Sequence, residues 1–263
     1  MSTQFQTIHG ARLACRLDGP ADAPVVMLGN SLAASMAMWQ PQQGALRAYR
    51  VLRFDTRGHG ASEATPAPYS IAMLADDAIG LLDALKIERV HFVGLSLGGM
   101  IGQVLGARHA DRLLSLVLCD TSSDMRAQRA AWDERIATAR RDGMAALAGP
   151  TLQRWFTPAF FGRNPQAVQA VRAMIEQTAV EGYCGCASAV RDLDQDALLA
   201  EIAVRTTVIA GELDPACTPA QARTLQSRIA DARLHLLPDA AHLPNIEQPA
   251  AFDAALRAHL DAT

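Results

Sequence analysis

Segments typical of strands and of helices alternate along most of this sequence, and that order constrains the fold more than any other feature. The apolar run at 25–28 is typical of a buried strand, whereas 71–85 carries apolar residues at helical spacing after Ser70, a common N-cap residue. Short joints between such segments predict an α/β fold, with a mostly parallel, twisted sheet flanked by helices. We predict strands at 5–8, 11–17, 25–28, 50–54, 89–93, 113–118, 206–210 and 233–237, and helices at 71–85, 97–109, 219–229 and 249–260.

One internal stretch interrupts this alternation. Residues 124–201 contain helical patterns at 125–142 and 166–178 and the aromatic segment RWFTPAFFG, but no convincing strand. We interpret 124–201 as a helical cap inserted into a core that is formed by 1–123 and 202–263.

Charge and composition narrow the class of partner. The 263 residues are 50% hydrophobic and 19% charged, carry a formal net charge of −3 and contain no basic run, which argues against a nucleic-acid or membrane-surface binder and favours a small-molecule substrate. There is no basic start followed by an apolar core, and no apolar run reaches about 18 residues, so we expect a cytoplasmic protein. The five scattered cysteines predict free thiols, and Cys184 and Cys186 are too close together for a zinc-finger pair, so no metal site is expected.

A candidate nucleophile lies where a predicted strand meets a predicted helix. The segment Gly94-Leu95-Ser96-Leu97-Gly98 is the Gly-x-Ser-x-Gly elbow, in which a tight turn lifts the serine hydroxyl above the sheet. Flanking glycines leave room for the strand and the helix to approach each other. The pattern alone is weak evidence, because it also occurs by chance in glycine-rich joints.

A serine hydroxyl needs a base and an orienting carboxylate to act as a nucleophile. Asp214 follows the strand at 206–210 and His242 follows the strand at 233–237, which reproduces the order Ser, Asp, His at the carboxyl ends of strands. We therefore predict a catalytic triad of Ser96, Asp214 and His242. Alternatives are less well placed: Asp120 or Glu212 for the carboxylate, and His59, His109 or His235 for the base.

Negative charge that develops on an attacked carbonyl oxygen requires two backbone N–H donors. Leu97 follows the nucleophile at a helix N-terminus and is one candidate. The second is expected from the loop after the strand at 25–28, where we favour Leu32, with Ser31 as the next choice.

Six parts of the chain together carry a family resemblance: NSL with MWQPQ, FDTRGHGAS, GLSLGGMIGQ, LVLCDTSS, EGYCGCASAVRDLD and AAHLPNIEQP. They resemble the α/β-hydrolase superfamily and, within it, the 3-oxoadipate enol-lactonases of aromatic (protocatechuate and catechol) catabolism. The resemblance covers nearly the whole chain, and it implies hydrolysis of 3-oxoadipate enol-lactone to 3-oxoadipate without a cofactor. Two departures are the pair Asn30-Ser31, where many superfamily members carry His-Gly, and Ala33, where the lactonases usually carry glycine.

A substrate with a carboxylate needs a cationic anchor in an otherwise apolar pocket, and arginine matches a carboxylate best. Arg135, Arg154 and Arg191 lie in or beside the predicted cap, and Trp132 and Trp155 are candidates for the pocket wall. Two other functions remain open. One is a general carboxylesterase or cofactor-free perhydrolase that uses the same residues, and the other is a ligand receptor with slow turnover.

Overall fold

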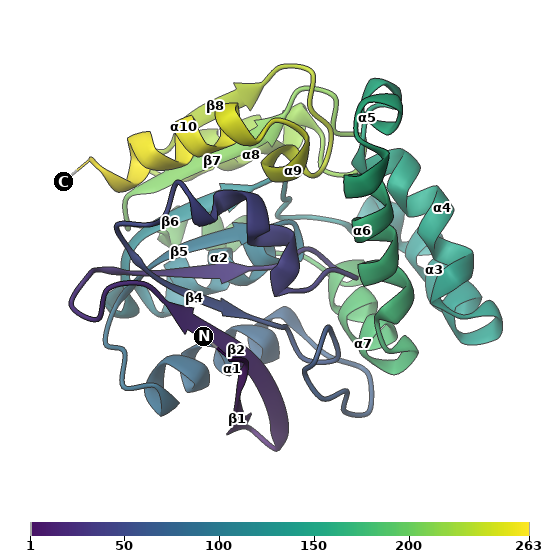
Figure 1. Ribbon diagram of the computed structural model, residues 1–263, viewed down its shortest axis with the longest axis horizontal. Coiled ribbons are helices and arrows are strands. Elements are labelled where there is room, and N and C mark those ends of the chain that lie inside the picture. Colours follow the sequence, from purple (N-terminus) through teal and green to yellow (C-terminus); the bar gives the residue numbers. More distant parts are fainter. Residues whose placement is uncertain (1, 263) are drawn as a thin grey trace.

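The computed structural model describes residues 2–262, and within them the strands form one eight-stranded sheet in the order β1-β2-β4-β3-β5-β6-β7-β8 (Figure 1). The β1–β2 and β2–β4 pairs are antiparallel, and all other pairs are parallel. The predicted α/β class and mostly parallel sheet are confirmed. The strands are β1 Gln4–Ile8, β2 Ala11–Asp18, β3 Val25–Gly29, β4 Arg50–Phe54, β5 Val90–Leu95, β6 Leu113–Cys119, β7 Thr206–Gly211 and β8 Arg233–Leu237.

Helices cover both faces of this sheet. The C-terminal helix α10 (Pro249–Leu260) lies across β6, β7 and β8, while α2 (Leu97–Arg108) packs against β3, β5 and β6 from behind (Figure 1). Beside α2 lies α1 (Ile71–Ala84), which begins at Ser70 as expected, because the Ser70 Oγ accepts a hydrogen bond from the Met73 N–H at 3.1 Å. The chain outside the β6–β7 connection also contains α8 (Pro219–Arg228), the short α9 (Pro244–Glu247) and the 3₁₀ segments η1 (Met36–Gln43) and η2 (Ala110–Arg112), and the 3₁₀ segment η4 (Asp196–Glu201) ends that connection.

Between β6 and β7 the chain forms a group of helices that stands to one side of the sheet, at the right in Figure 1. The expected helix at 125–142 is a 3₁₀ turn η3 (Arg126–Gln128) followed by α3 (Arg129–Asp142), and the one at 166–178 is α6 (Pro165–Gln177). Sequence analysis did not assign three further helices, α4 (Met144–Trp155), α5 (Pro158–Arg163) and α7 (Val180–Arg191). We call α3 to α7 the cap helices.

Helix α7 was not predicted from the sequence because its glycines have low helical propensity, yet these glycines are needed for its packing. A Cβ atom on Gly182 would lie 2.2 Å from the Gly58 carbonyl oxygen, and one on Gly185 would lie 2.6 Å from the Tyr69 ring. The helix therefore tolerates residues of low helical propensity in exchange for close contact with the core.

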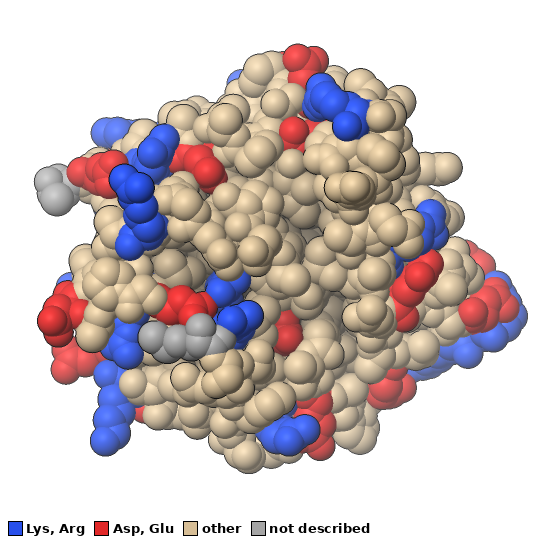
Figure 2. Space-filling view, in the orientation of Figure 1, with Lys and Arg blue, Asp and Glu red and all other residues tan. Residues whose placement is uncertain are grey.

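Three further features of the described chain concern cysteine pairing, surface charge and helix length. All five cysteines are buried and unpaired, as predicted. Basic and acidic side chains are interspersed on the face seen in Figure 2, without a large basic patch. No helix within residues 2–262 has the length and apolar character needed to cross a bilayer.

Candidate active site

Ser96 occupies a strained turn between β5 and α2. Its backbone angles are φ 55° and ψ −111°, a left-handed region that non-glycine residues seldom adopt. The glycines on either side have steric reasons: a Cβ on Gly94 would lie 2.2 Å from the Gly98 carbonyl oxygen, and one on Gly98 would lie 2.3 Å from that of Gly29. The turn is held by its backbone, because the Ser96 N–H donates to the Cys119 carbonyl at 2.8 Å and the Thr121 hydroxyl donates to the Ser96 carbonyl at 2.8 Å.

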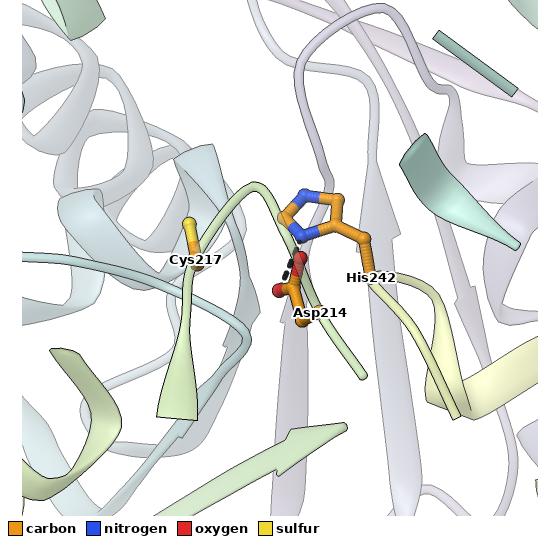
Figure 3. Close-up of side chains that lie close together, drawn as sticks. All are labelled: Asp214, Cys217 and His242. Carbon is orange, nitrogen blue, oxygen red and sulfur yellow. Dashed lines mark hydrogen bonds and ion pairs between the residues drawn. The ribbon is translucent and has the colours of Figure 1, made fainter. Parts of the chain in front are cut away.

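His242 and Asp214 form a buried hydrogen-bonded pair beyond the ends of β8 and β7. The His242 Nδ1 lies 2.8 Å from the Asp214 Oδ2, as the dashed line in Figure 3 marks. The other Asp214 oxygen accepts a hydrogen bond from the Ala216 N–H at 2.7 Å. Because a carboxylate only accepts, Nδ1 donates the proton in this pair, and Nε2 is left as the ring nitrogen that can accept a proton from Ser96.

The competing carboxylates have other environments. Asp120 is buried and accepts a hydrogen bond from the Gly211 N–H at 2.8 Å, while its Oδ2 has no partner among the described residues. Burial and the nearby Asp214 raise the pKa of Asp120 well above its usual range, which favours a neutral acid there. Glu212 is exposed to solvent. Only Asp214 bonds to a histidine in the described chain.

The competing histidines do not open onto the same cavity as Ser96. The Nδ1 of His59 lies 3.1 Å from the Arg57 carbonyl in its own loop, and burial lowers the pKa of His59 to about 4. His109 lies at the end of α2, 4.0 Å from Asp76, and His235 lies within β8. Geometry therefore favours His242 as the base.

The loop after β3 is fastened beside the elbow by Asn30. The Asn30 carbonyl accepts from the Gly98 N–H at 2.9 Å, and its side chain accepts from Trp39 Nε1 at 3.0 Å and donates to the Phe54 carbonyl at 2.7 Å. These three hydrogen bonds account for asparagine at the position where many superfamily members have histidine. It presents Ser31 and Leu32 to the cavity that contains Ser96, and Leu97 begins α2 next to it. Neither the Leu32 N–H nor the Leu97 N–H donates to a protein acceptor within residues 2–262.

The cavity that joins these groups lies between the sheet and the cap helices. Ser96 and His242 line its floor, and Trp132, Arg135, Arg154 and Trp155 line its cap side. The Trp155 ring lies 5.9 Å from the His242 ring, centroid to centroid. Several other wall residues were not predicted as site residues: Thr151, Tyr183, Cys217, Met125, Met144 and Ile175. Of these, only Tyr183 lies in a segment that carries the family resemblance.

Two of the three predicted arginines face this cavity without an acidic partner in the described chain. The Arg135 guanidinium lies over the Trp132 ring, 4.4 Å from its centroid, and Arg154 bonds only to the Thr151 hydroxyl, at 3.4 Å. Burial lowers the pKa of both arginines, and the neighbouring Arg135 lowers that of Arg154 further. Burial also raises the pKa of Tyr183 to about 12, so its hydroxyl stays neutral. These groups form a pole of positive potential that can hold an anion.

Arg191 does not belong to this group, which corrects its prediction as a substrate ligand. Its guanidinium pairs with Asp133 at 3.0 Å and with Asp192 at 2.6 Å, and it does not line the cavity. The turn at the end of α7 directs this side chain toward α3 rather than inward.

Cys217 brings a thiol close to the catalytic pair. One ligand atom from each of Asp214, Cys217 and His242 lies within 4.8 Å of the others (Figure 3). A metal ion would compete there with the Ala216 N–H and the His242 Nδ1–H, which both bind the Asp214 carboxylate. Both oxygens of the Asp214 carboxylate are therefore already bound by N–H donors.

Comparison with known proteins agrees with the geometry. A model of the alpha/beta hydrolase fold family matches residues 24–249. The chain is 36% identical to 3-oxoadipate enol-lactonase 2 of Acinetobacter baylyi over 91% of this chain and 90% of the relative. It is 33% identical to a putative carbamate hydrolase, RutD, of Variovorax paradoxus, over 90% of this chain and 92% of that protein. A crystal structure of the enol-lactonase from Burkholderia xenovorans LB400 superposes with a TM-score of 0.96 at 42% identity, covering 98% of this chain and 100% of the other. The chain therefore belongs to the alpha/beta hydrolase fold family and is a hydrolase.

Proposed function

We propose that this protein is a serine hydrolase that opens a small carboxylate-bearing lactone, and that its substrate is 3-oxoadipate enol-lactone. The main support for the proposal is one cavity that has a candidate nucleophile and base at its floor and two arginines on its cap side. Ser96 and His242 lie on its floor, and Arg135 and Arg154 lie on its cap side without acidic partners in the described chain. Both arginines are half-buried, and a partly desolvated cation without an acidic partner is costly, so two of them in one cavity favour an anionic ligand. The similarity to enol-lactonases supports the same substrate.

The first half of the proposed reaction forms an acyl-enzyme. His242 Nε2 takes the proton of the Ser96 hydroxyl as Oγ attacks the lactone carbonyl carbon, and the Leu32 and Leu97 N–H groups stabilise the oxyanion. Asp214 stabilises the imidazolium that forms. Collapse of the tetrahedral intermediate breaks the ring C–O bond, and His242 returns its proton to the leaving enolate oxygen. The enol then becomes the ketone, while the chain stays attached to Ser96 through its acyl carbon.

In the second half, water is the attacking group in place of the Ser96 hydroxyl. His242 removes a proton from the water as its oxygen attacks the acyl carbon, and the same two N–H groups stabilise the second oxyanion. The Ser96 oxygen leaves and recovers a proton from His242. The product is the free dicarboxylic keto acid, and the enzyme returns to its starting state. Through both halves, the arginines hold the carboxylate that does not react.

Steady-state hydrolysis of freshly generated 3-oxoadipate enol-lactone by the wild type and by Ser96→Ala tests this proposal. We expect kcat to fall by about four orders of magnitude or more in the variant, because the nucleophile of the proposed reaction is removed. p-Nitrophenyl acetate serves as the reference substrate. Near-normal lactone turnover by Ser96→Ala would refute the mechanism, and comparable wild-type rates on both substrates would favour a general esterase.

Carbamate hydrolysis is the second candidate, because the chain is also 33% identical to a putative carbamate hydrolase. Ammonia release from carbamate above the spontaneous rate, measured with the same enzyme preparation, distinguishes the two. We expect the lactone to be the better substrate, because a lactone that keeps a remote carboxylate can use both the nucleophile and the arginine pole.

A further inference from the structure

A buried carboxylate outside the catalytic triad joins the cap to the loop that carries His242. Glu247 is 3% exposed and lies at the end of α9, five residues after His242. Its Oε2 accepts a hydrogen bond from the Ala241 N–H at 2.9 Å, directly before His242. Its Oε1 accepts from both the N–H of Thr157, at 3.0 Å, and the hydroxyl of Thr157. The Glu247 side chain thus bonds both to the loop that carries His242 and to the cap.

The cap approaches the other side of His242 through a second contact. The Leu243 N–H donates to the Trp155 carbonyl at 3.3 Å, and the Trp155 ring lies beside the His242 imidazole. The residues before and after His242 are therefore both linked to residues 155–157, Ala241 through Glu247 and Leu243 directly. These residues join α4, which carries Arg154 and Trp155 of the cavity wall, to α5, which Thr157 caps through the Phe160 N–H.

The sheet closes the remaining side of the same loop. A Cβ on Gly211 at the end of β7 would lie 2.2 Å from the Ala241 carbonyl oxygen, and the Leu213 N–H donates to the Ala240 carbonyl at 2.9 Å. The sheet thus holds the loop on one side and the cap contacts hold it on another, while Asn245 of α9 donates to the Met38 carbonyl of η1 at 2.9 Å. A carboxylate that accepts three hydrogen bonds without an arginine or lysine partner is suited to hold backbone N–H groups in one arrangement.

We propose that Glu247 is a positioning residue that sets the location of His242 and of the substrate-binding wall of the cap together. It acts through its hydrogen bonds to Ala241 and Thr157 and does not touch the substrate. The inference rests on the proposed function, because it requires His242 to be the base for Ser96. Its consequence is that the cap geometry and the geometry of proton transfer are coupled, so disturbance at one site changes the other.

Glu247→Gln tests this directly. An amide offers one accepting oxygen in place of two, so its NH₂ group must face either the Ala241 N–H or the Thr157 N–H. We expect the rate at which a fluorophosphonate labels Ser96 to fall about 10- to 100-fold, as does kcat for p-nitrophenyl acetate, because a base shifted by about 1 Å loses this much. For the lactone, which also needs the cap wall, we expect KM to rise as well.

The matched control is Glu134→Gln, which makes the same change in an exposed Glu–Thr pair, since the Thr138 hydroxyl donates to Glu134 at 3.3 Å on α3. It should label at the wild-type rate. All rates are measured well below each variant's melting temperature, with the folded fraction checked by circular dichroism. If Glu247→Gln does not fold, Thr157→Val and Thr157→Ser replace it: valine removes the hydroxyl donor and should slow labelling, whereas serine keeps it and should restore the rate.

Two failures are distinguishable. If the wild type labels at Ser96 but Glu247→Gln, or Thr157→Val in its place, labels at the same rate, the positioning role is wrong and the proposed function stands. If Ser96→Ala labels as well as the wild type, the assignment of the nucleophile is wrong, and the proposed function and this inference both fall. A fall in labelling with a wild-type KM for the lactone would overturn the coupling to the cap.

Discussion

Two of the buried, hydrogen-bonded histidines of the described chain lie at opposite ends of strand β7. His242, beyond the carboxyl ends of β7 and β8, faces the Asp214 carboxylate and a cavity. His259, on α10, faces hydroxyl groups near the other ends: its Nδ1 lies 2.8 Å from the Thr207 Oγ1 and its Nε2 lies 2.7 Å from the Ser115 Oγ. Both rings are nearly inaccessible, 2% and 4% exposed, so burial alone does not separate a catalytic histidine from a structural one.

The partners make the difference. A carboxylate stabilises the positive charge that the His242 ring acquires when it takes a proton, whereas hydroxyls hold a neutral ring without compensating a charge. Burial, assisted by Arg205 and by His91, lowers the pKa of His259 to about 3. The carboxyl ends of parallel strands are where α/β proteins place ligands. We therefore expect changes at that end to alter rates and changes at the other end to alter stability.

Alanine at each histidine gives the sharpest contrast. His242→Ala should lower kcat/KM by about 10⁴-fold or more with little change in melting temperature. His259→Ala should leave kcat/KM within about twofold but lower the free energy of unfolding by about 2–3 kcal/mol, because it opens a cavity and leaves the buried Thr207 hydroxyl without its partner. Kinetics and urea unfolding of both variants test this. A loss of activity in folded His259→Ala would show that the two ends are not independent.

The arginine pole gives the next largest expected effect. Arg154→Met should lower kcat/KM for the lactone about 100-fold, because a charge-assisted hydrogen bond to the substrate carboxylate is lost. Hydrolysis of p-nitrophenyl acetate, which has no carboxylate, should be unchanged. Arg191→Met, in the surface ion pairs of α7, is the matched control and should leave both rates unchanged. Equal losses on both substrates would indicate damage to the catalytic groups in place of lost anion binding.

How much the sequence predicts differs between the two ends. The elbow and the order Ser96, Asp214, His242 are readable because each residue follows a strand in a recognisable local pattern. The hydrogen bonds of His259 could not be predicted from the sequence, since its hydroxyl partners are 52 and 144 positions away along the chain. The arginines show the same limit. Charge and position in the cap suggested Arg135, Arg154 and Arg191 equally, but only packing decides which side chain points inward.

Acidification should destabilise the protein through His91 and His259, which lie at the end of the sheet away from the cavity. Burial lowers the pKa of His91 and of His259, to about 4 and about 3. Their unfolded values are near 6.5, so between about pH 6.5 and pH 4 the unfolded chain binds more protons than the folded one. The stabilisation that these neutral rings provide is complete above about pH 6.5 and is lost progressively as the pH falls. Urea midpoints from pH 7.5 to pH 4.5 measure it, and His259→Asn should flatten the slope. An unchanged slope in that variant would assign the acid sensitivity to other groups.

The smallest expected effect comes from one hydroxyl of the His259 network. Thr207→Val keeps the shape of the side chain but removes the Oγ1 that lies 2.8 Å from His259 Nδ1. It should cost about 1–2 kcal/mol, since a buried ring nitrogen loses its partner, which corresponds to a fall in melting temperature of about 2–8 °C for a protein of this size. Activity at 25 °C should not change, although Thr207 and the carboxyl end that precedes Asp214 belong to the same strand, β7. If Thr207→Val lowered kcat without unfolding the protein, strand β7 would transmit strain to Asp214, and the separation of the two ends would fail.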